Sequence, residues 1–144
     1  MKKESMKTYH RVRMFDTDCA NVIFFGSQFR YFHEAIEVLF DQIGVPFSVM
    51  FSTSPFLFVV VHASADFIKP LTIGDAIEIQ TRLKEMGDSS CTLLFEMFRE
   101  GTLVGRGEIV QVCLDAKTRT KIRIPDSFRE KVQNFLPQSN GHSS

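Results

Sequence analysis

Two carboxylates stand close together in an otherwise apolar stretch of the chain. Asp16 and Asp18 are separated by one threonine and are followed by Cys19, Ala20 and Asn21. A carboxylate can attack a carbonyl carbon or remove a proton from water. Aspartate and asparagine also favour turns, where their side chains bond the local backbone. The residue types therefore leave two interpretations open, an Asx-type turn or a catalytic carboxylate that faces a cavity.

A long helix is predicted directly after this segment, over residues 27–43. Ser27 is the expected N-cap, Gly44 fits the position after the last turn, and Pro46 prevents continuation. The N–H groups at a helix start can polarise a carbonyl group and stabilise the negative charge that develops on its oxygen. A carboxylate beside this helix start would therefore complete a site for chemistry at a carbonyl. The apolar residues that define the buried stripe of the helix are Phe29, Phe32, Ile36, Leu39, Phe40 and Ile43.

The remaining elements must form a sheet against this helix. The later strands are joined by short turns that contain glycine, and consecutive strands with short turns are antiparallel. The sequence therefore predicts an α+β fold in which the helix lies on one face of an antiparallel sheet. We expect a flexible lead over 1–7, one domain over 8–136 and a disordered tail over 137–144. The expected strands cover 8–15, 56–70, 77–84, 90–99 and 103–114, with a short extension at 117–124 and a terminal helix at 125–136.

Composition limits the class of protein. The 144 residues suit one domain, and 17 basic residues balance 17 acidic ones, whereas a nucleic-acid binder normally carries a basic excess. No apolar run is long enough for a membrane span, and the charged N-terminus is not followed by a secretory segment. The three cysteines have no metal or redox spacing and are expected to be reduced thiols. We therefore expect a cytoplasmic protein without nucleic-acid or membrane partners.

Several catalytic and cofactor motifs are absent from the sequence. It has no glycine-rich phosphate loop, no Gly-x-Ser-x-Gly elbow and no His/Cys metal set. Serine hydrolase, nucleotide hydrolase and zinc enzyme interpretations therefore lack support. Phenylalanine is unusually frequent, with 15 copies, of which 11 fall between Phe15 and Phe67. These rings either fill the core or line an apolar pocket for an acyl or aryl group.

The segment that contains the two aspartates carries a longer pattern. It consists of Phe15-Asp16-Thr17-Asp18, Val22-Ile23-Phe24-Phe25, Phe29-Arg30-Tyr31-Phe32 and Glu34-Ala35. This block resembles the opening signature of the 4-hydroxybenzoyl-CoA thioesterase family of hotdog enzymes. A second block, over 66–71 and followed by Gly74-Asp75, resembles the same family's turn between its second and third strands. The resemblance covers 9–136 and implies a single hotdog domain, in which a curved antiparallel sheet of about five strands wraps a long central helix.

The resemblance also implies an assembly and a substrate. Members of this family form homodimers, which often pair into homotetramers, and their active sites lie at the dimer interface. The substrate is a small-molecule acyl-CoA thioester, so no separate cofactor and no metal ion is expected. We therefore expect a homo-oligomer, a dimer or a dimer of dimers, that is inactive as a monomer.

Catalytic roles follow from the resemblance residue by residue. The second aspartate of the motif is the family's catalytic carboxylate and corresponds to Asp18, and the amide that holds the thioester carbonyl corresponds to Phe25. Asp18 would act either as a nucleophile through a mixed anhydride or as a base toward water, and Asp16 would support the turn. The expected substrate-binding residues are Asn21, Val22, Phe24, Phe29 and Ser90.

Three departures from the family pattern bear on these roles. Asn21 replaces the usual glycine, and asparagine tolerates the positive φ that such a turn requires. Phe25-Gly26 replaces a Tyr-His pair of many relatives, so a mechanism that needs this histidine is not available. The stretch 85–90 lacks the basic cluster with which some relatives hold the phosphates of coenzyme A. The phosphates must contact other residues, or the acyl group arrives on a carrier protein instead.

The leading hypothesis is hydrolysis of an aromatic or medium-chain acyl-CoA, and three alternatives stay open. The first is an acyl-carrier-protein thioesterase, and the second is a non-catalytic hotdog protein that binds acyl thioesters. The third, an enoyl-thioester hydratase, needs a histidine near the acid, and none follows Asp18 in its loop. Glu34 and His62 are weaker candidates for catalysis. The following alternating cations either face solvent or hold phosphates: Lys117, Arg119, Lys121 and Arg123.

Overall fold

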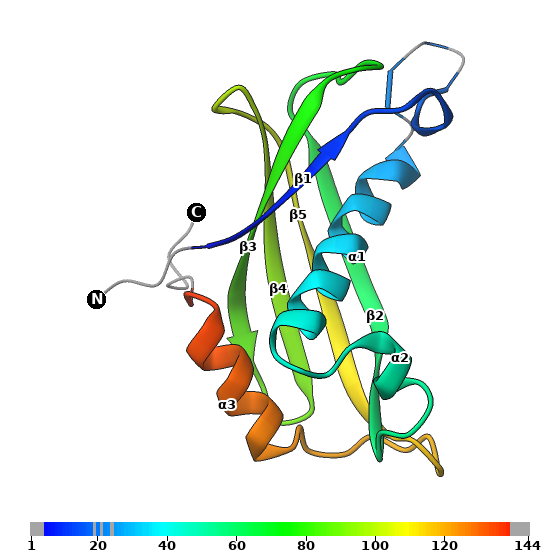
Figure 1. Cartoon of the computed structure of the whole chain (residues 1–144), viewed down its shortest axis with the longest axis vertical. Coiled ribbons are helices and arrows are strands. Elements are labelled where there is room, and N and C mark those ends of the chain that lie inside the picture. The colour runs from blue at the N-terminus through cyan, green and yellow to red at the C-terminus, as the bar shows by residue number, and fades with distance from the viewer. Residues whose placement is uncertain (1–4, 19, 21, 24, 139–144) are drawn as a thin grey trace.

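A sheet and one long helix form the two layers of the molecule (Figure 1). This computed structural model describes residues 5–18, 20, 22, 23 and 25–138. Five antiparallel strands lie in the order β1-β3-β4-β5-β2, and α1 lies across one face of the sheet. The expected α+β class and hotdog arrangement are confirmed. The elements are β1 (Met6–Arg11), α1 (Phe25–Gln42), α2 (Phe47–Met50), β2 (Phe56–Phe67), β3 (Ala76–Met86), β4 (Ser90–Arg99), β5 (Thr102–Asp115) and α3 (Asp126–Phe135), with a 3-10 turn at Met14–Asp16.

The apolar stripe of α1 packs against the inner face of the sheet. Phe32, Ala35, Ile36 and Leu39 are buried, and the ring of Phe32 stacks on Phe95 of β4 with 4.8 Å between the ring centroids. Burial of each large apolar side chain contributes about 1.5–3 kcal/mol. This contact between the two layers therefore holds α1 in a fixed place on the sheet.

Small residues let the first half of α1 approach the sheet closely. A Cβ atom at Gly107 of β5 would lie 2.6 Å from the ring of Phe32 and would also meet the backbone of β2. Ala65 of β2 is the cross-strand partner of Gly107, and Ala63 follows on the same face. At Gly107 and Ala65 the sheet has no large side chain, so the ring of Phe32 rests close to the backbone of β2 and β5.

α1 begins at Phe25, two residues before the predicted start. The prediction that Ser27 is the N-cap is wrong, because Ser27 lies inside the first turn of the helix. Its hydroxyl donates a hydrogen bond to the main-chain oxygen of Asp16 at 3.0 Å. The serine therefore joins the helix to the preceding loop rather than closing the helix on itself.

The end of α1 follows the sequence prediction. Gly44 has a φ of +85°, which glycine adopts without steric cost, and the N–H of Val45 donates to the carbonyl oxygen of Phe40 at 2.9 Å. Pro46 then leads into α2, a single turn of helix too short to give a periodic signal in the sequence. No helix among the described residues is long and apolar enough to cross a membrane.

Two predicted strand regions differ from the structure for one physical reason. The first strand ends at Arg11 rather than Phe15, because the carboxylate of Asp16 accepts the Arg13 N–H at 2.9 Å and closes a 3-10 turn. The segment 117–124 forms a single bridge within the described chain, from Lys121 to β5, and no strand. There an aspartate at the end of β5 accepts two backbone N–H groups. In both places a side chain competes with the sheet for the backbone donors.

Asp16 joins the loop before α1 to the first two turns of the helix. Its side chain is 1% exposed, and its Oδ2 accepts hydrogen bonds from the Tyr31 hydroxyl at 2.7 Å and the Arg13 N–H at 2.9 Å. The guanidinium group of Arg30 donates to Oδ1, and the Ser27 hydroxyl donates to the Asp16 main-chain oxygen. Three residues of the helix thus bond one aspartate, which fixes the loop on the helix start.

These donors also stabilise the charge of Asp16. Burial alone would raise the pKa of Asp16, but hydrogen bonds from Arg13, Tyr31 and Arg30 outweigh burial and hold the pKa below its usual value. The charged carboxylate therefore stabilises the fold above the ordinary pKa of an aspartate. That contribution is lost as the pH falls through the lowered pKa of Asp16.

We expect Asp16→Ala to lower the free energy of unfolding by about 2–3 kcal/mol at neutral pH, because it removes the buried acceptor of Tyr31 and Arg30. The cost is smaller than for a fully buried ion pair because the Arg30 side chain is 42% exposed. Urea unfolding at several pH values measures the free energy of unfolding of the wild type and of the variant. Since Asp16 loses its charge in acid, the difference between the two proteins should shrink below pH 3.8.

Glu34→Ala is the matched control for this experiment. Glu34 pairs with the other side of the same Arg30 guanidinium but is itself 42% exposed. Its removal should cost less than about 1 kcal/mol. If Asp16→Ala lowered the free energy of unfolding no more than Glu34→Ala does, the anchoring role of Asp16 would be contradicted.

Candidate active site

Asp18 lies in a cleft between two regions of the chain, over residues 18–25 and 67–70. The cleft has a volume of about 410 Å³ and lies between the loop after Asp16, the start of α1 and the segment after β2. Its walls are mostly apolar, and Asp18 and Lys69 are its charged residues. The residues that line it are Asp18, Val22, Ile23, Phe25, Phe67, Ile68, Lys69 and Pro70.

Backbone hydrogen bonds hold the loop of Asp18 in shape. The N–H of Asp18 donates to the carbonyl oxygen of Val22 at 3.0 Å, and Thr17 forms a bridge with Ile23. The N–H of Ile23 donates to the carbonyl oxygen of Leu71 at 2.8 Å. The loop is therefore closed on itself and fastened to the segment that follows β2.

The two oxygens of the Asp18 carboxylate have different surroundings. Oδ1 accepts the N–H of Ala20 at 2.8 Å, which is an Asx-type turn. Oδ2 accepts no hydrogen bond from any residue that the structure describes, and the side chain is exposed in the single chain. The first oxygen thus orients the carboxylate, and the second is available to a ligand in the cleft.

The first turn of α1 borders the same cleft. Phe25 is the first residue of the helix, and its ring is 60% exposed. Amides at this position carry the positive end of the helix dipole, and the first turn contains no acidic residue that would offset it. A carbonyl group bound here would be stabilised as its oxygen gains negative charge. The cleft thus combines a carboxylate with an environment that activates a carbonyl.

The predicted site residues divide between this cleft and other parts of the fold. Val22 lines the cleft together with Asp18 and Phe25. Phe29 lies one turn further along α1, where its half-buried ring packs edge-on against Phe32 at 6.4 Å between centroids. It is therefore behind the cleft rather than in its wall.

Ser90 lies far from this cleft within one chain. It begins β4 and is the cross-strand partner of Val112, whereas the cleft lies where β2 ends, at the other end of the sheet (Figure 1). Its predicted contact with substrate could only involve the cleft of a neighbouring copy. Asn21 and Phe24, as well as Cys19, lie outside the described residues, so their predicted roles stay predictions.

The cleft wall at the end of β2 and just after it is not predicted from the sequence. The second motif block predicts a turn of the fold, yet Phe67, Ile68, Lys69 and Pro70 from this block face Asp18 across the cleft. The available signal was an apolar and basic run at the end of a buried strand. Only the fold shows that this run lies beside the start of α1.

The weaker catalytic candidates have other partners or positions. Glu34 bonds Arg30, and its Oε2 lies 3.1 Å from Nδ1 of His10. Burial lowers the pKa of His10, although the charge of Glu34 opposes this shift. His62 is exposed on β2 and does not line the cleft. Among the described residues that line the cleft, no histidine is present to support the hydratase alternative.

The described cysteines do not form a reactive or metal-binding site. Cys91 and Cys113 are buried free thiols, in agreement with the expected reduced state. Burial raises the pKa of Cys91 to about 12 and that of Cys113 to about 11, so both stay protonated and unreactive at neutral pH. In the parts of the chain that the structure describes, no group of three or more His, Cys, Asp or Glu side chains could hold a metal ion.

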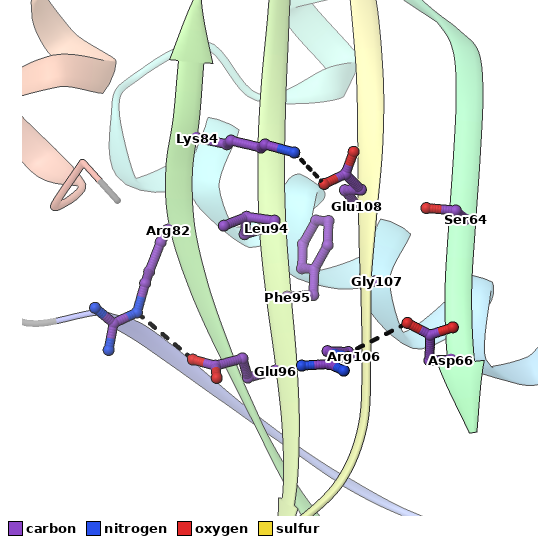
Figure 2. A pocket seen from close by; sticks show the side chains of 10 residues that line it. All are labelled: Ser64, Asp66, Arg82, Lys84, Leu94, Phe95, Glu96, Arg106, Gly107 and Glu108. Atoms are coloured by element: carbon purple, nitrogen blue, oxygen red, sulfur yellow. Dashed lines mark hydrogen bonds and ion pairs between the residues drawn. The ribbon is translucent and has the colours of Figure 1, made fainter. Parts of the chain in front are cut away.

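A larger hollow lies on the face of the sheet opposite α1, but its charges are already matched (Figure 2). It measures about 520 Å³ and is lined by residues of all four strands from β2 to β5. Figure 2 shows that each cation there faces a carboxylate of another strand, and that the pair of Lys84 and Glu108 spans β4. The N···O distances are 3.7 Å for Arg82–Glu96, 3.5 Å for Arg106–Asp66 and 2.8 Å for Lys84–Glu108. The cleft at Asp18 is therefore the better candidate for chemistry.

Comparison with known sequences identifies the family. The model of the thioesterase-like superfamily matches residues 12–132. A 1,4-dihydroxy-2-naphthoyl-CoA hydrolase from Nostoc punctiforme is 32% identical over 135 residues, which are 93% of this chain and 91% of that protein. The narrower resemblance to 4-hydroxybenzoyl-CoA thioesterases stays a prediction.

Comparison with solved structures agrees with this result. A gentisyl-coenzyme A thioesterase superposes with a TM-score of 0.81 at 25% identity, over 88% of this chain and 99% of that one. A 1,4-dihydroxy-2-naphthoyl-CoA thioesterase from Synechocystis has a TM-score of 0.82 at 23% identity, over 89% and 95% of the two chains, and supports the fold. The chain therefore belongs to the thioesterase-like superfamily and is a hotdog-fold acyl-CoA thioesterase.

Proposed function

We propose that the protein hydrolyses an aromatic acyl-CoA to the free acid and coenzyme A, with Asp18 as the catalytic carboxylate. One observation carries this proposal. The carboxylate of Asp18 lines the same apolar cleft as Phe25, the first residue of α1. A carboxylate and a helix start on one cleft are the two parts that acyl transfer requires.

Two routes of hydrolysis fit this arrangement, and both place the thioester oxygen at the Phe25 amide. In the first, an oxygen of Asp18 attacks the carbonyl carbon, the thiolate of coenzyme A leaves and is protonated, and water then cleaves the mixed anhydride. In the second, Asp18 removes a proton from a water molecule that attacks the same carbon, the carbon–sulfur bond breaks, and the leaving thiolate takes the proton from Asp18. Either route consumes one water molecule and returns the carboxylate unchanged.

An aromatic acyl group suits the walls of the cleft. Phe25 and Phe67 are 60% and 52% exposed, and Ile68 lies next to them, so a flat apolar group would cover surface that now faces solvent. The relatives named above act on naphthoyl and gentisyl thioesters, which are aromatic. Lys69 gives the cleft a positive charge that favours the approach of the polyanionic coenzyme A. A thiol-release assay with aryl-CoA, medium-chain acyl-CoA and acyl-carrier-protein thioesters separates the three substrate classes.

We also propose that the working unit is a homodimer that forms along β2. β2 is twelve residues long and forms one edge of the sheet. Val60 and Val61, beside a register shift of this strand, are 44% and 58% exposed. A long apolar edge strand is a template for pairing with another chain. A second copy along this edge would cover the neighbouring cleft wall at Phe67 and exclude water from Asp18.

We expect Asp18→Asn to lower the rate of thiol release by about two to four orders of magnitude, because the amide can neither attack the carbonyl nor accept a proton. The folding and the affinity for substrate should change little, since Asp18 is exposed. Asp66→Asn is the matched control, because Asp66 is an exposed carboxylate on the opposite face of the sheet. Full activity of the Asp18→Asn protein would refute the assignment.

Val61→Lys should convert the dimer to monomers and reduce thiol release in parallel, because a charged side chain on an edge strand opposes its pairing with another chain. Analytical ultracentrifugation measures the assembly, and circular dichroism checks the fold. Tyr9→Lys is the control, since Tyr9 is 70% exposed on β1, the other edge of the sheet. If the Val61→Lys protein remained dimeric, the proposed interface would be wrong. If it became a fully active monomer, the proposed role of the interface in the site would be wrong.

A further inference from the structure

Phe51 is an aromatic side chain that is exposed although the backbone around it is well bonded. It follows α2, is 59% exposed, and its ring packs edge-on against Phe47 at 5.6 Å between centroids. The main-chain oxygen of Val49 accepts three N–H groups, those of residues 52–54, at 2.9 to 3.2 Å. A bonded turn therefore holds the ring of Phe51 in solvent.

α2, which precedes Phe51, and the start of α1 lie on the same face of the sheet but at opposite ends of β2 (Figure 1). Phe47 contacts Phe40 of α1 at 5.3 Å between ring centroids, so this turn belongs to the helix layer. The cleft of Asp18 lies in the same layer, because the start of α1 borders it. β2 begins shortly after Phe51 and ends at Phe67, in the cleft wall. The strand spans about 35 Å, so Phe51 lies far from the cleft of its own chain.

The proposed dimer brings these two ends of β2 together. A two-fold axis perpendicular to the sheet makes the paired β2 strands antiparallel and keeps both helix layers on one side. If the strands pair over their whole length, the axis passes near the middle of β2, beside Val61. The start of β2 in one subunit then lies next to the end of β2 in the other. The partner's Phe51 thus lies in the helix layer, beside the cleft wall at Phe67.

The exposed apolar side chains of the molecule fit this arrangement. One group lies at the cleft, a second in the middle of β2 and a third before its start, and each member is at least 42% exposed: Phe25, Phe67 and Ile68, then Val60 and Val61, then Val49 and Phe51. Apolar surface along a whole edge is typical of an interface rather than of a free surface. The two-fold axis places the third group against the first, so both are removed from water together.

We propose that Phe51 of each subunit closes the acyl cleft of the other subunit. The acyl group lies between the ring of Phe25, the wall at Phe67 and the partner's Phe51. Asp18 is exposed in the single chain, and the partner's Phe51 excludes water from its carboxylate. This inference rests on the proposed function and on the proposed dimer. It adds a residue that sets the size of the acyl pocket from the subunit that does not carry the catalytic carboxylate.

Mixed dimers test whether Phe51 acts on the cleft of the other subunit. Phe51→Ala should lower kcat/KM for an aryl-CoA about tenfold, because the acyl group loses its contact with an aromatic side chain. Asp18→Asn and Phe51→Ala subunits carry different affinity tags, so dimers that contain one of each can be isolated. In such a dimer one cleft carries both changes, and the other has an intact Asp18 and an intact Phe51 from the partner. We expect about half of the wild-type activity, since one of two equivalent clefts is intact.

The result that would overturn the inference has a different size. If Phe51 acted within its own chain, the mixed dimer would have one cleft without Asp18 and one without Phe51. Its activity would then be about one twentieth of wild type, half of the tenfold-reduced rate. A Phe51→Ala protein with unchanged kcat/KM would overturn the inference as well. Phe135→Ala is the control and should keep the wild-type activity, because Phe135 is a 36% exposed ring on α3, away from β2.

A fluorescence measurement tests the same contact without catalysis. The chain contains no tryptophan, so Phe51→Trp introduces a single indole. Phenacyl-CoA, an inert thioether analogue of an aryl-CoA, should change the indole emission of this protein on binding and leave that of Phe135→Trp unchanged. An indole at position 51 that does not respond while calorimetry shows the ligand bound would overturn the inference. This measurement decides even if Phe51→Ala does not fold.

The inference and the proposed function fail in different ways. A wild type that releases no thiol, but whose Phe51→Trp variant responds to the ligand, would refute the hydrolysis and leave the role of Phe51 intact. Thiol release by the wild type together with an unresponsive indole would refute the role of Phe51 alone. A wild type that is monomeric in ultracentrifugation would overturn the inference together with the dimer.

Discussion

The bonds to the buried carboxylate of Asp16 are the constraint on which the rest of the site depends. The cleft is built from one loop, the helix start that follows it and a segment far along the chain, and hydrogen bonds fix the loop to the other two. Asp16 fixes the loop to α1 through Tyr31 and Arg30, and the Ile23 N–H fixes the same loop to the segment after β2. If the bonds to Asp16 were lost, the loop would no longer have a defined position relative to the helix start.

Two aspartates that are two positions apart therefore have opposite environments. Asp16 is almost fully buried and all of its acceptors are used within the fold, whereas Asp18 is exposed and uses one oxygen for its own turn. The first arrangement suits a permanent charge that positions its neighbours. The second leaves a carboxylate oxygen for a ligand. The same residue type thus acts as a support in one case and as a proposed catalyst in the other, and the difference comes from burial and donors alone.

The sequence predicts the layers of this fold well, because periodic burial leaves a strong pattern. The predicted strand at 90–99 matches β4 in full, and the end of α1 follows from Gly44. The boundaries fail where a side chain bonds the backbone in place of a regular element. Before α1, the Asp16 carboxylate accepts the Arg13 N–H, and the Ser27 hydroxyl donates to the main-chain oxygen of Asp16. An aspartate signals a turn in the sequence, but only the folded chain shows which backbone group its side chain bonds.

The site is predicted in part. Asp18, Val22 and Phe25 come together as the motif implies, because they are close in sequence and lie on one loop and its helix. Lys69 and Phe67 enter the cleft only because β2 ends beside the helix start, which no local pattern reveals. The exposure of Phe51 is equally invisible in the sequence, where its ring is one of many that could fill the core.

A crystal structure of the wild-type protein with a phenacyl-CoA thioether would test the central claim most directly. The ketone of this ligand takes the place of the thioester carbonyl and cannot be hydrolysed. The account predicts its oxygen within about 2.7–3.1 Å of the Phe25 amide nitrogen and an oxygen of Asp18 within about 3–3.5 Å of the ketone carbon or of a water beside it. A ketone bound away from the start of α1, with the Asp18 carboxylate turned to solvent, would contradict the account.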